Sequence, residues 1–383
     1  QIKRGILDMI GAARPSIADP FLPRKIEEGR IEDIRECIGC NICVSGDWTQ
    51  SPIRCTQNPT MGEEWRRSWH PEIIEQRGES EKVLVVGAGP AGLEAAMSLG
   101  QRGYEVALAD SGDGGGRVVL ESGLPGLASY KRVSDYRLGQ IAKLANVGFF
   151  PGSEMDRASV LEFGADQVLI TTGARWRADG LGRATHAPIP GIADHPQCFT
   201  PDDIMTGQLP STDSVLVYDD DHYYMGGVIA QLLADSGKTV TLVTPGPEVS
   251  CWTQNTMEQH RIEKALLDRD VTLIAKHTLT GVAPDSASFA CNTTDRVLSV
   301  EAPALVMVTL RAPQNGLYFS LAGEAQEQLD ELPFGLLRIG DCMAPATIAA
   351  AVYDGHRAAR EMDNLPDPDG VPFKREQSII DPP

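Results

Sequence analysis

Four cysteines between residues 37 and 55 carry the most specific chemistry that this sequence predicts. Cys37, Cys40, Cys43 and Cys55 follow the pattern C-x2-C-x2-C-x11-C. Thiolates at this spacing are typical of one [4Fe–4S] cluster, because the chain can wrap around a cubane while backbone amides of the same turns face the sulfur atoms. A tetrahedral zinc site normally uses two separate C-x2-C pairs, and here the second is missing, so zinc and simple free thiols are the weaker alternatives. A cluster that transfers single electrons predicts a role in electron transfer.

A second motif, Gly87-Ala-Gly89-Pro-Ala-Gly92, has the form G-x-G-x-x-G. Its glycines let the backbone approach a pyrophosphate, and the N-terminus of the following helix attracts negative charge. Asp110 lies about twenty residues further on, at the end of the next strand, where an acid binds ribose hydroxyls. The elements that position this loop are a strand, a helix and a second strand, expected at residues 82–86, 91–102 and 105–109. Together they predict an adenine nucleotide site.

Further candidate residues for this site lie at the ends of two later apolar strands and after a glycine pair. Thr172 and Gly173 end the strand that begins near residue 166, and Gly340 and Asp341 end the strand that begins near residue 336. Arg117 follows Gly115-Gly116, and this motif and Gly340-Asp341 are also ones that a bound FAD uses. We expect these strands to join the first two in one parallel sheet that an inserted unit interrupts.

The insert begins like another nucleotide-binding unit but has a different turn. A strand over residues 214–218 leads to Asp219-Asp220-Asp221, where a pyrophosphate needs amides and no negative charge. The next strand ends at Thr244-Pro245, with neither an acid for ribose nor an arginine for a 2′-phosphate. The unit is therefore expected to keep the fold without an NAD(P)H site.

Composition limits the class of protein. The 383 residues leave room for two or three domains, and the net charge of −19 argues against nucleic acid and anionic membranes as partners. The sequence contains neither a signal peptide nor an apolar run long enough to span a membrane. Clustered cysteines suit a reducing compartment, so we expect a cytoplasmic protein. The chain begins without methionine, and Leu7-Asp-Met-Ile-Gly looks like the middle of a strand-and-loop unit, with a short apolar strand expected near Leu7. This suggests a piece of a longer polypeptide or a separate subunit.

Motifs around the cysteines carry a family resemblance. They are Asp8-Met-Ile-Gly-Ala-Ala-Arg14, Cys37-Ile-Gly-Cys40-Asn-Ile-Cys43, Cys55-Thr-Gln-Asn58 and Trp69-His-Pro-Glu72. With the nucleotide motif they resemble the trimethylamine and dimethylamine dehydrogenases, iron–sulfur flavoproteins of the old yellow enzyme class. The resemblance covers essentially the whole chain. It implies an α/β protein in which the remnant of a TIM barrel and an iron–sulfur segment precede two Rossmann-like, glutathione-reductase-like nucleotide-binding domains.

The resemblance also implies the domain limits and cofactors. Most of the (β/α)8 barrel, which holds FMN and the catalytic residues in the family, would lie upstream, so no catalytic residue is assigned to this chain. The four cysteines match the cluster ligands, the nucleotide motif matches a site for ADP or FAD, and Arg14 matches a contact to the FMN phosphate. The expected limits are a barrel end at 1–35, an iron–sulfur segment at 36–80, a nucleotide domain at 81–210 plus 326–365, a degenerate NAD(P)-type domain at 211–325 and a tail at 366–383.

The function that the resemblance implies is oxidative demethylation of a di- or trimethylamine-type substrate. Electrons would pass from FMN through the cluster to electron-transfer flavoprotein, in a homodimer. Histamine, dimethylglycine and betaine-derived amines are alternative substrates. Two other functions stay open, namely an NAD(P)H-dependent FAD/FMN/[4Fe–4S] enoyl reductase of the 2,4-dienoyl-CoA type and a stand-alone electron-transfer subunit. In the family an aromatic residue helps to dock the acceptor, and Val133 occupies its place here, with Tyr130 and Tyr136 nearby.

Overall fold

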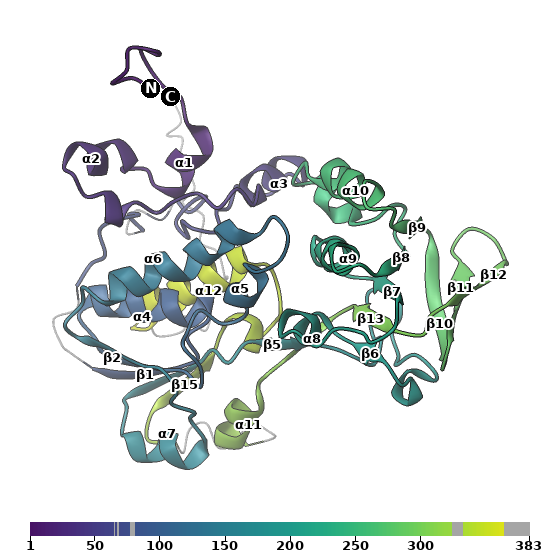
Figure 1. Cartoon of the computed structure of the whole chain (residues 1–383). Coiled ribbons are helices and arrows are strands. Elements are labelled where there is room, and N and C mark those ends of the chain that lie inside the picture. The colour runs from purple at the N-terminus through teal and green to yellow at the C-terminus, as the bar shows by residue number, and fades with distance from the viewer. Residues whose placement is uncertain (65, 67–68, 77–80, 324–331, 364–383) are drawn as a thin grey trace, which may run out of the picture.

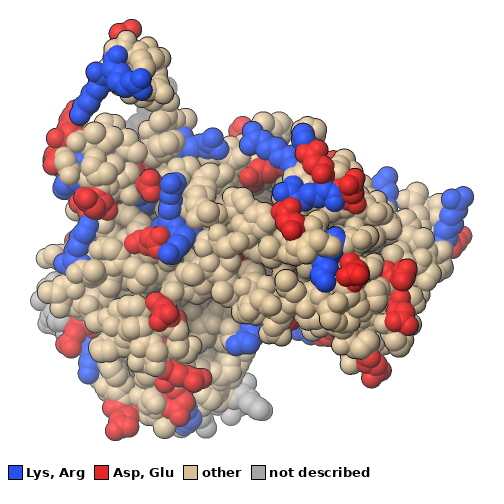
Figure 2. Space-filling view, in the orientation of Figure 1, with Lys and Arg blue, Asp and Glu red and all other residues tan. Residues whose placement is uncertain are grey.

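The computed structural model describes residues 1–64, 66, 69–76, 81–323 and 332–363. Two lobes, each built on a parallel sheet, lie side by side below an N-terminal segment (Figure 1). The expected tail at 366–383 lies outside the described residues. In the part of the chain that is described, no helix is both long and apolar enough to cross a membrane. On the face drawn in Figure 2, acidic and basic side chains are interspersed.

The first lobe contains a five-stranded parallel sheet in the order β15-β4-β1-β2-β3. Its strands are β1 (Lys82–Val86), β2 (Glu105–Ala109), β3 (Val147–Phe150), β4 (Gln167–Ile170) and β15 (Gly335–Arg338). The chain leaves this sheet after β4 and returns only with β15. The prediction that these strands form one sheet around an insert is therefore confirmed, and their carboxyl ends gather the glycine loop, Thr172 and Asp341 at one edge.

Helices cover both faces of this sheet. One face carries α4 (Pro90–Arg102), α6 (Arg132–Ile141) and α12 (Ile348–Glu361), and the other carries α7 (Arg157–Phe163) and α11 (Gly316–Ala322) (Figure 1). Helices α4 and α12 pack closely because Gly355 has no side chain: a Cβ there would lie 2.2 Å from the carbonyl oxygen of Ala91. The sheet is buried on both sides, which explains its continuous apolar strands.

The second lobe repeats the parallel pattern in the order β6-β13-β7-β8-β9. Its elements are β6 (Cys198–Phe199), α8 (Pro201–Met205), β7 (Ser214–Asp219), α9 (Met225–Asp235), β8 (Thr239–Val243), α10 (Gln259–Leu267), β9 (Thr272–Ile274) and β13 (Leu305–Val308). An antiparallel sheet of β10 (His277–Ala283), β11 (Ser286–Cys291) and β12 (Val297–Glu301) extends it, and β5 (Ala174–Trp176) pairs with β14 (Arg311–Pro313) between the lobes. Because β6 hydrogen-bonds to β13, this sheet takes in residues before the expected boundary at 211.

The N-terminal segment is helical where it is regular. It contains α1 (Ala13–Ala18), α2 (Leu22–Glu27) and α3 (Ile42–Trp48), and α5 (Arg117–Glu121) follows in the first lobe. The strand expected near Leu7 does not form. Ile6, Leu7 and Ile10 are instead exposed. A strand needs neighbouring strands to satisfy its amides and carbonyls, and none of the described strands lies beside these residues.

A buried polar network joins α4 to α12. Glu94 accepts hydrogen bonds from His356 Nδ1 at 2.9 Å and from Arg137 Nε at 2.7 Å, and His356 Nε2 accepts one from Arg360 Nε at 3.1 Å. Burial lowers the pKa of His356, so its imidazole is neutral and donates from Nδ1. Burial alone would raise the pKa of Glu94, but the charge of Arg137 and the hydrogen bond from His356 outweigh it and lower this pKa to about 2.

This network predicts that the protein loses stability on acidification. Below pH 6.5, the ordinary pKa of histidine, His356 takes up a proton in the unfolded chain but not in the folded protein. Below pH 4.5, the ordinary pKa of glutamate, Glu94 takes up a proton in the unfolded chain, whereas in the folded protein it stays ionised down to about pH 2. Both effects lower the free energy of unfolding as pH falls. Urea unfolding measured between about pH 7.5 and 5.5 should show a steeper loss in the wild type than in His356→Gln. Equal slopes would contradict this expectation.

Candidate functional site

The four clustered cysteines line one small cavity of about 20 Å³. A left-handed turn brings them together, with φ of 74° at Gly39 and 54° at Asn41 ahead of α3. The Gly39 amide donates to the sulfur of Cys37 at 3.4 Å, as expected of turns that wrap a cluster. Among the residues that the structure describes, no three His, Cys, Asp or Glu side chains lie close enough to hold a single metal ion.

The surroundings of the thiols are largely apolar. Burial raises the pKa of Cys40 to about 11 and also raises the pKa values of Cys43 and Cys55. Hydrogen bonds act in the opposite direction: the sulfur of Cys40 lies 3.1 Å from the Thr56 hydroxyl, and the amides of Asn58 and Gln57 face Cys55. A strongly cationic group would be needed to keep these sulfurs as thiolates, and the iron of a bound cluster would supply that charge. The donor set fits a [4Fe–4S] cluster.

Arg14 lies beside the same cavity rather than at a distance from it. It lines the cavity with the cysteines, is exposed, and donates to the side chain of Asn41. Asn41 in turn donates to the carbonyl of Thr256 at 2.9 Å in the second lobe. An exposed guanidinium next to the cysteines remains available to a phosphate, and the expected contact to FMN stays a prediction.

The predicted nucleotide residues gather around a larger cavity of about 780 Å³ in the first lobe. The ones that line it are Gly87, Gly89, Asp110, Arg117, Thr172, Gly173 and Asp341. The other two predicted glycines, Gly92 and Gly340, do not line the cavity but pack against the glycine loop and the start of α4. A Cβ at Gly92 would lie 1.9 Å from the carbonyl oxygen of Gly87, and Gly340 has φ of 65° and approaches Ala91.

Asp110 is hydrogen-bonded to the glycine loop. Its Oδ2 accepts from the Ala88 amide at 2.6 Å and its Oδ1 from the Gly112 amide at 2.7 Å. The carboxylate therefore fixes the loop against the end of β2, at the place where a ribose would lie. Gly89 differs from its neighbours, because a Cβ there would meet nothing within 4 Å and would point into open space.

Two arginines, one of which sequence reasoning missed, hold Asp341. Arg117 Nη2 lies 3.0 Å from Asp341 Oδ2, and Arg311 pairs with the same oxygen. The Ala346 amide donates to Oδ1 at 3.0 Å. Arg311 sits on β14, whose pairing with β5 is visible only in three dimensions, so no local pattern marked it. The side chain of Thr172 is hydrogen-bonded to the Gln314 carbonyl.

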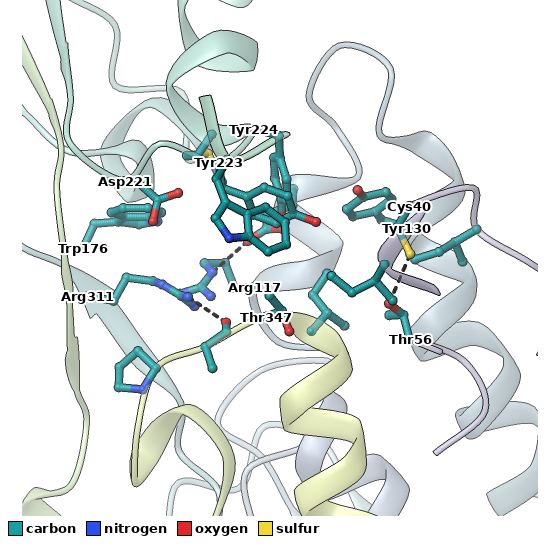
Figure 3. A pocket seen from close by; sticks show the side chains of 18 of the residues that line it. Cys40, Thr56, Arg117, Tyr130, Trp176, Asp221, Tyr223, Tyr224, Arg311 and Thr347 are labelled. Atoms are coloured by element: carbon teal, nitrogen blue, oxygen red, sulfur yellow. Dashed lines mark hydrogen bonds and ion pairs between the residues drawn. The ribbon is translucent and has the colours of Figure 1, made fainter. Parts of the chain in front are cut away.

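A third cavity, of about 340 Å³, shares lining residues with both of these cavities. In Figure 3, Cys40 and Thr56 lie on one side of it, Trp176 and Arg311 lie on the other, and Tyr223 and Tyr224 are between them. Arg117 lines this cavity as well as the nucleotide cavity. The cysteine site and the nucleotide site are therefore neighbours across the interface of the lobes.

In the second lobe, buried carboxylates pack into the turn that follows β7. Asp219 accepts hydrogen bonds from the amides of Asp221 at 3.2 Å and His222 at 3.1 Å, and a Cβ at Gly226 would lie 2.4 Å from its carboxyl carbon. The fully buried Asp220 lies 3.2 Å from the His222 ring. Burial, and then the charge of Asp221, raise the pKa of Asp219.

These two sheets and their glycine loop define a two-domain, dinucleotide-binding oxidoreductase fold. A model of the pyridine nucleotide-disulphide oxidoreductases matches residues 81–329. The chain therefore belongs to this family.

The relatives are more specific. Dimethylamine dehydrogenase from Hyphomicrobium sp. (strain x) is 36% identical over 98% of the chain, which covers 54% of that protein. Histamine dehydrogenase from Rhizobium sp. 4-9 is 47% identical, with a TM-score of 0.94 over 100% of this chain and 56% of that one. The 6-hydroxypseudooxynicotine amine oxidase from Pseudomonas geniculata N1 is 44% identical, with a TM-score of 0.91 over 95% and 54%. The predicted resemblance to the amine dehydrogenase family is confirmed, and the chain spans about half the length of these relatives.

Proposed function

We propose that this chain is the electron-relay part of an iron–sulfur flavoprotein amine dehydrogenase. The whole enzyme would oxidatively demethylate a di- or trimethylamine-type substrate and deliver electrons to electron-transfer flavoprotein. The observation that carries the proposal is the single cavity bounded by four cysteines, adjoining a nucleotide-binding lobe. Relatives of this chain include a dimethylamine dehydrogenase and a histamine dehydrogenase, whose names refer to amines.

Each part of the chain has a role in this proposal. Residues 1–35 would be the end of the FMN barrel and residues 36–80 the iron–sulfur segment. The cluster, when bound, supplies single-electron transfer between flavin and acceptor. The chain's residues hold it: Cys37, Cys40, Cys43 and Cys55 as ligands, with the nearby amides as hydrogen-bond donors. Arg14 would bind the FMN phosphate, and the first-lobe cavity would hold ADP or FAD.

The second lobe favours this function over an NAD(P)H-dependent enoyl reductase. A reductase of that kind needs a working pyridine nucleotide site. Here Asp219 takes the amides of the turn, and buried carboxylates stand where a pyrophosphate would bring two more negative charges. Electrons are therefore proposed to enter from an amine and not from NAD(P)H.

The partners and location remain part of the proposal. We propose electron-transfer flavoprotein as the acceptor, a homodimer as the assembly and the cytoplasm as the location. The net charge of −19 over the whole chain would favour an acceptor with a positively charged surface.

The decisive experiment uses the full-length protein without oxygen. Dimethylamine, trimethylamine or histamine is expected to bleach its flavin, whereas NADH and NADPH are expected to leave the spectrum unchanged. Chemical analysis should find iron and acid-labile sulfide, and acid extraction should release ADP or FAD beside FMN. Rapid bleaching by NADPH and none by any amine would overturn the proposal in favour of a reductase.

A further inference from the structure

Arg137 is the most deeply buried arginine near the cysteines. It lies on α6 with 0% of its surface exposed, and each of its side-chain nitrogens has a partner. Nη1 donates to the Gln57 side-chain oxygen at 3.0 Å and to the Val133 carbonyl at 2.8 Å, and Nη2 donates to the Gln57 main-chain carbonyl at 3.1 Å. Nε binds Glu94, as described above. The planar guanidinium therefore grips Gln57 at both its main chain and its side chain.

Gln57 connects the two ends of the cysteine segment. It follows Cys55 by two residues, is 1% exposed, and its Nε2 donates to the carbonyl of Glu36 at 2.9 Å, directly before Cys37. The backbone amides of Gln57 and Asn58 face the sulfur of Cys55. A shift of Gln57 would therefore reach both the Cys55 loop and the Cys37 turn.

Arg35 holds the other side of the same loop. Its Nη1 donates to the Asn58 side chain at 3.2 Å and its amide donates to Asp19 Oδ2 at 2.8 Å. It is 5% exposed. Two buried cations thus contact the Cys55 loop, and each has a carboxylate partner: Arg137 pairs with Glu94 on α4, and Arg35 lies 3.7 Å from Glu72. Along the contacts that lead from Cys55 through Gln57, the first charged group is the guanidinium of Arg137.

We propose that Arg137 is a positioning residue for the cluster: acting through Gln57, it aims the amides that face Cys55 and sets the cluster's reduction potential. This inference rests on the proposed function, since it assumes that the cysteines hold the cluster. Hydrogen bonds to sulfur and nearby positive charge both favour the reduced, more negative cluster. Loss of the hydrogen bonds between Arg137 and Gln57 should therefore shift the reduction potential of the cluster in the negative direction.

The test is a redox titration of full-length protein, followed by electron paramagnetic resonance of the reduced cluster. Arg137→Lys keeps the positive charge but cannot donate to the side chain and the main chain of Gln57 at once. Gln57→Leu removes the side-chain acceptor and keeps the main-chain one. Each is expected to lower the ratio of reduced to oxidised cluster at fixed potential by about tenfold, the lower end of typical outer-shell effects. For one electron this equals about 59 mV.

The double variant distinguishes this role from general loosening. If Arg137 acts through Gln57, Arg137→Lys with Gln57→Leu should shift the potential by less than the sum of the two single-variant shifts, because Gln57→Leu already lacks the side-chain contact and keeps only the main-chain one. Additive shifts, or an unchanged potential in Arg137→Lys, would overturn the inference. Arg269→Lys, at an exposed pair with Asp235 in the second lobe, is the matched control and should not move the potential.

A second variant tests the charge argument separately. Glu94→Gln keeps an acceptor for Arg137 Nε but removes its balancing charge, so the potential should shift in the positive direction. A negative shift there would contradict the charge argument. Wild-type protein without iron would refute the proposed function itself, whereas a normal cluster with unmoved potentials in all variants would refute only the role of Arg137.

Discussion

Cys40→Ala in the full-length protein is expected to cause the largest loss of function. Cys40 lines both the small cysteine cavity and the cavity between the lobes, so it lies where the proposed cluster meets the rest of the molecule. Removing one of four thiolates should lower iron and acid-labile sulfide content and the visible absorbance of the cluster. Under the proposed function, amine should still reduce FMN in this variant, while turnover with the acceptor falls by about 100-fold.

Cys291→Ala is the matched control for this experiment. Cys291 ends β11 in the antiparallel sheet and contacts neither cavity, so iron content and turnover should stay at wild-type levels. Normal iron content and normal turnover with the acceptor in Cys40→Ala would contradict the proposal that this chain relays electrons through a cluster. Loss of iron in both variants would point instead to general damage by cysteine substitution.

Gly89→Val is expected to remove the nucleotide while leaving the fold intact. A side chain at this position enters the open space of the nucleotide cavity and meets no other atom within 4 Å of its Cβ. It would occupy the path of a pyrophosphate, and we expect an affinity loss of about a hundredfold, or about 2.8 kcal/mol. Acid extraction followed by chromatography should therefore release little ADP or FAD, while FMN is retained.

Two other glycines separate binding from folding. Gly139→Ala, at an exposed position of α6 with no atom within 4 Å of its Cβ, should leave nucleotide content unchanged and raise thermal stability slightly, because alanine favours a helix more than glycine does. Gly92→Val should lower stability, because its Cβ would overlap the Gly87 carbonyl. Wild-type nucleotide content in Gly89→Val would show that the ligand, if any, binds elsewhere.

Much of the first lobe was predictable from sequence because its signals are local. The strand, glycine loop, helix and following acid are adjacent in the chain, and the structure places Gly87, Gly89 and Asp110 on one cavity. The cysteine spacing is equally local, and all four line one cavity. Strand limits also agreed to within a residue or two, since apolar runs between turns are sharply bounded.

Features that depend on contacts between distant segments were not predictable. Arg311 meets Asp341 only because β14 pairs with β5, and Gln57 meets Arg137 across 80 positions of sequence. The strand expected near Leu7 failed for the related reason that strand pairing is not a local property. Arg14 was predicted as a phosphate contact, and its position beside the cysteines was not anticipated.

The aspartate-filled turn of the second lobe also limits how a cofactor site could be built there. A cofactor could bind at this turn only after Asp219 is replaced and the Asp220 carboxyl, which packs against Gly182, is moved. It would also need a hydrogen-bonding partner for its ribose near Thr244. No one of these changes alone would clear the turn, so a pyridine nucleotide site could be built here only by several substitutions made together.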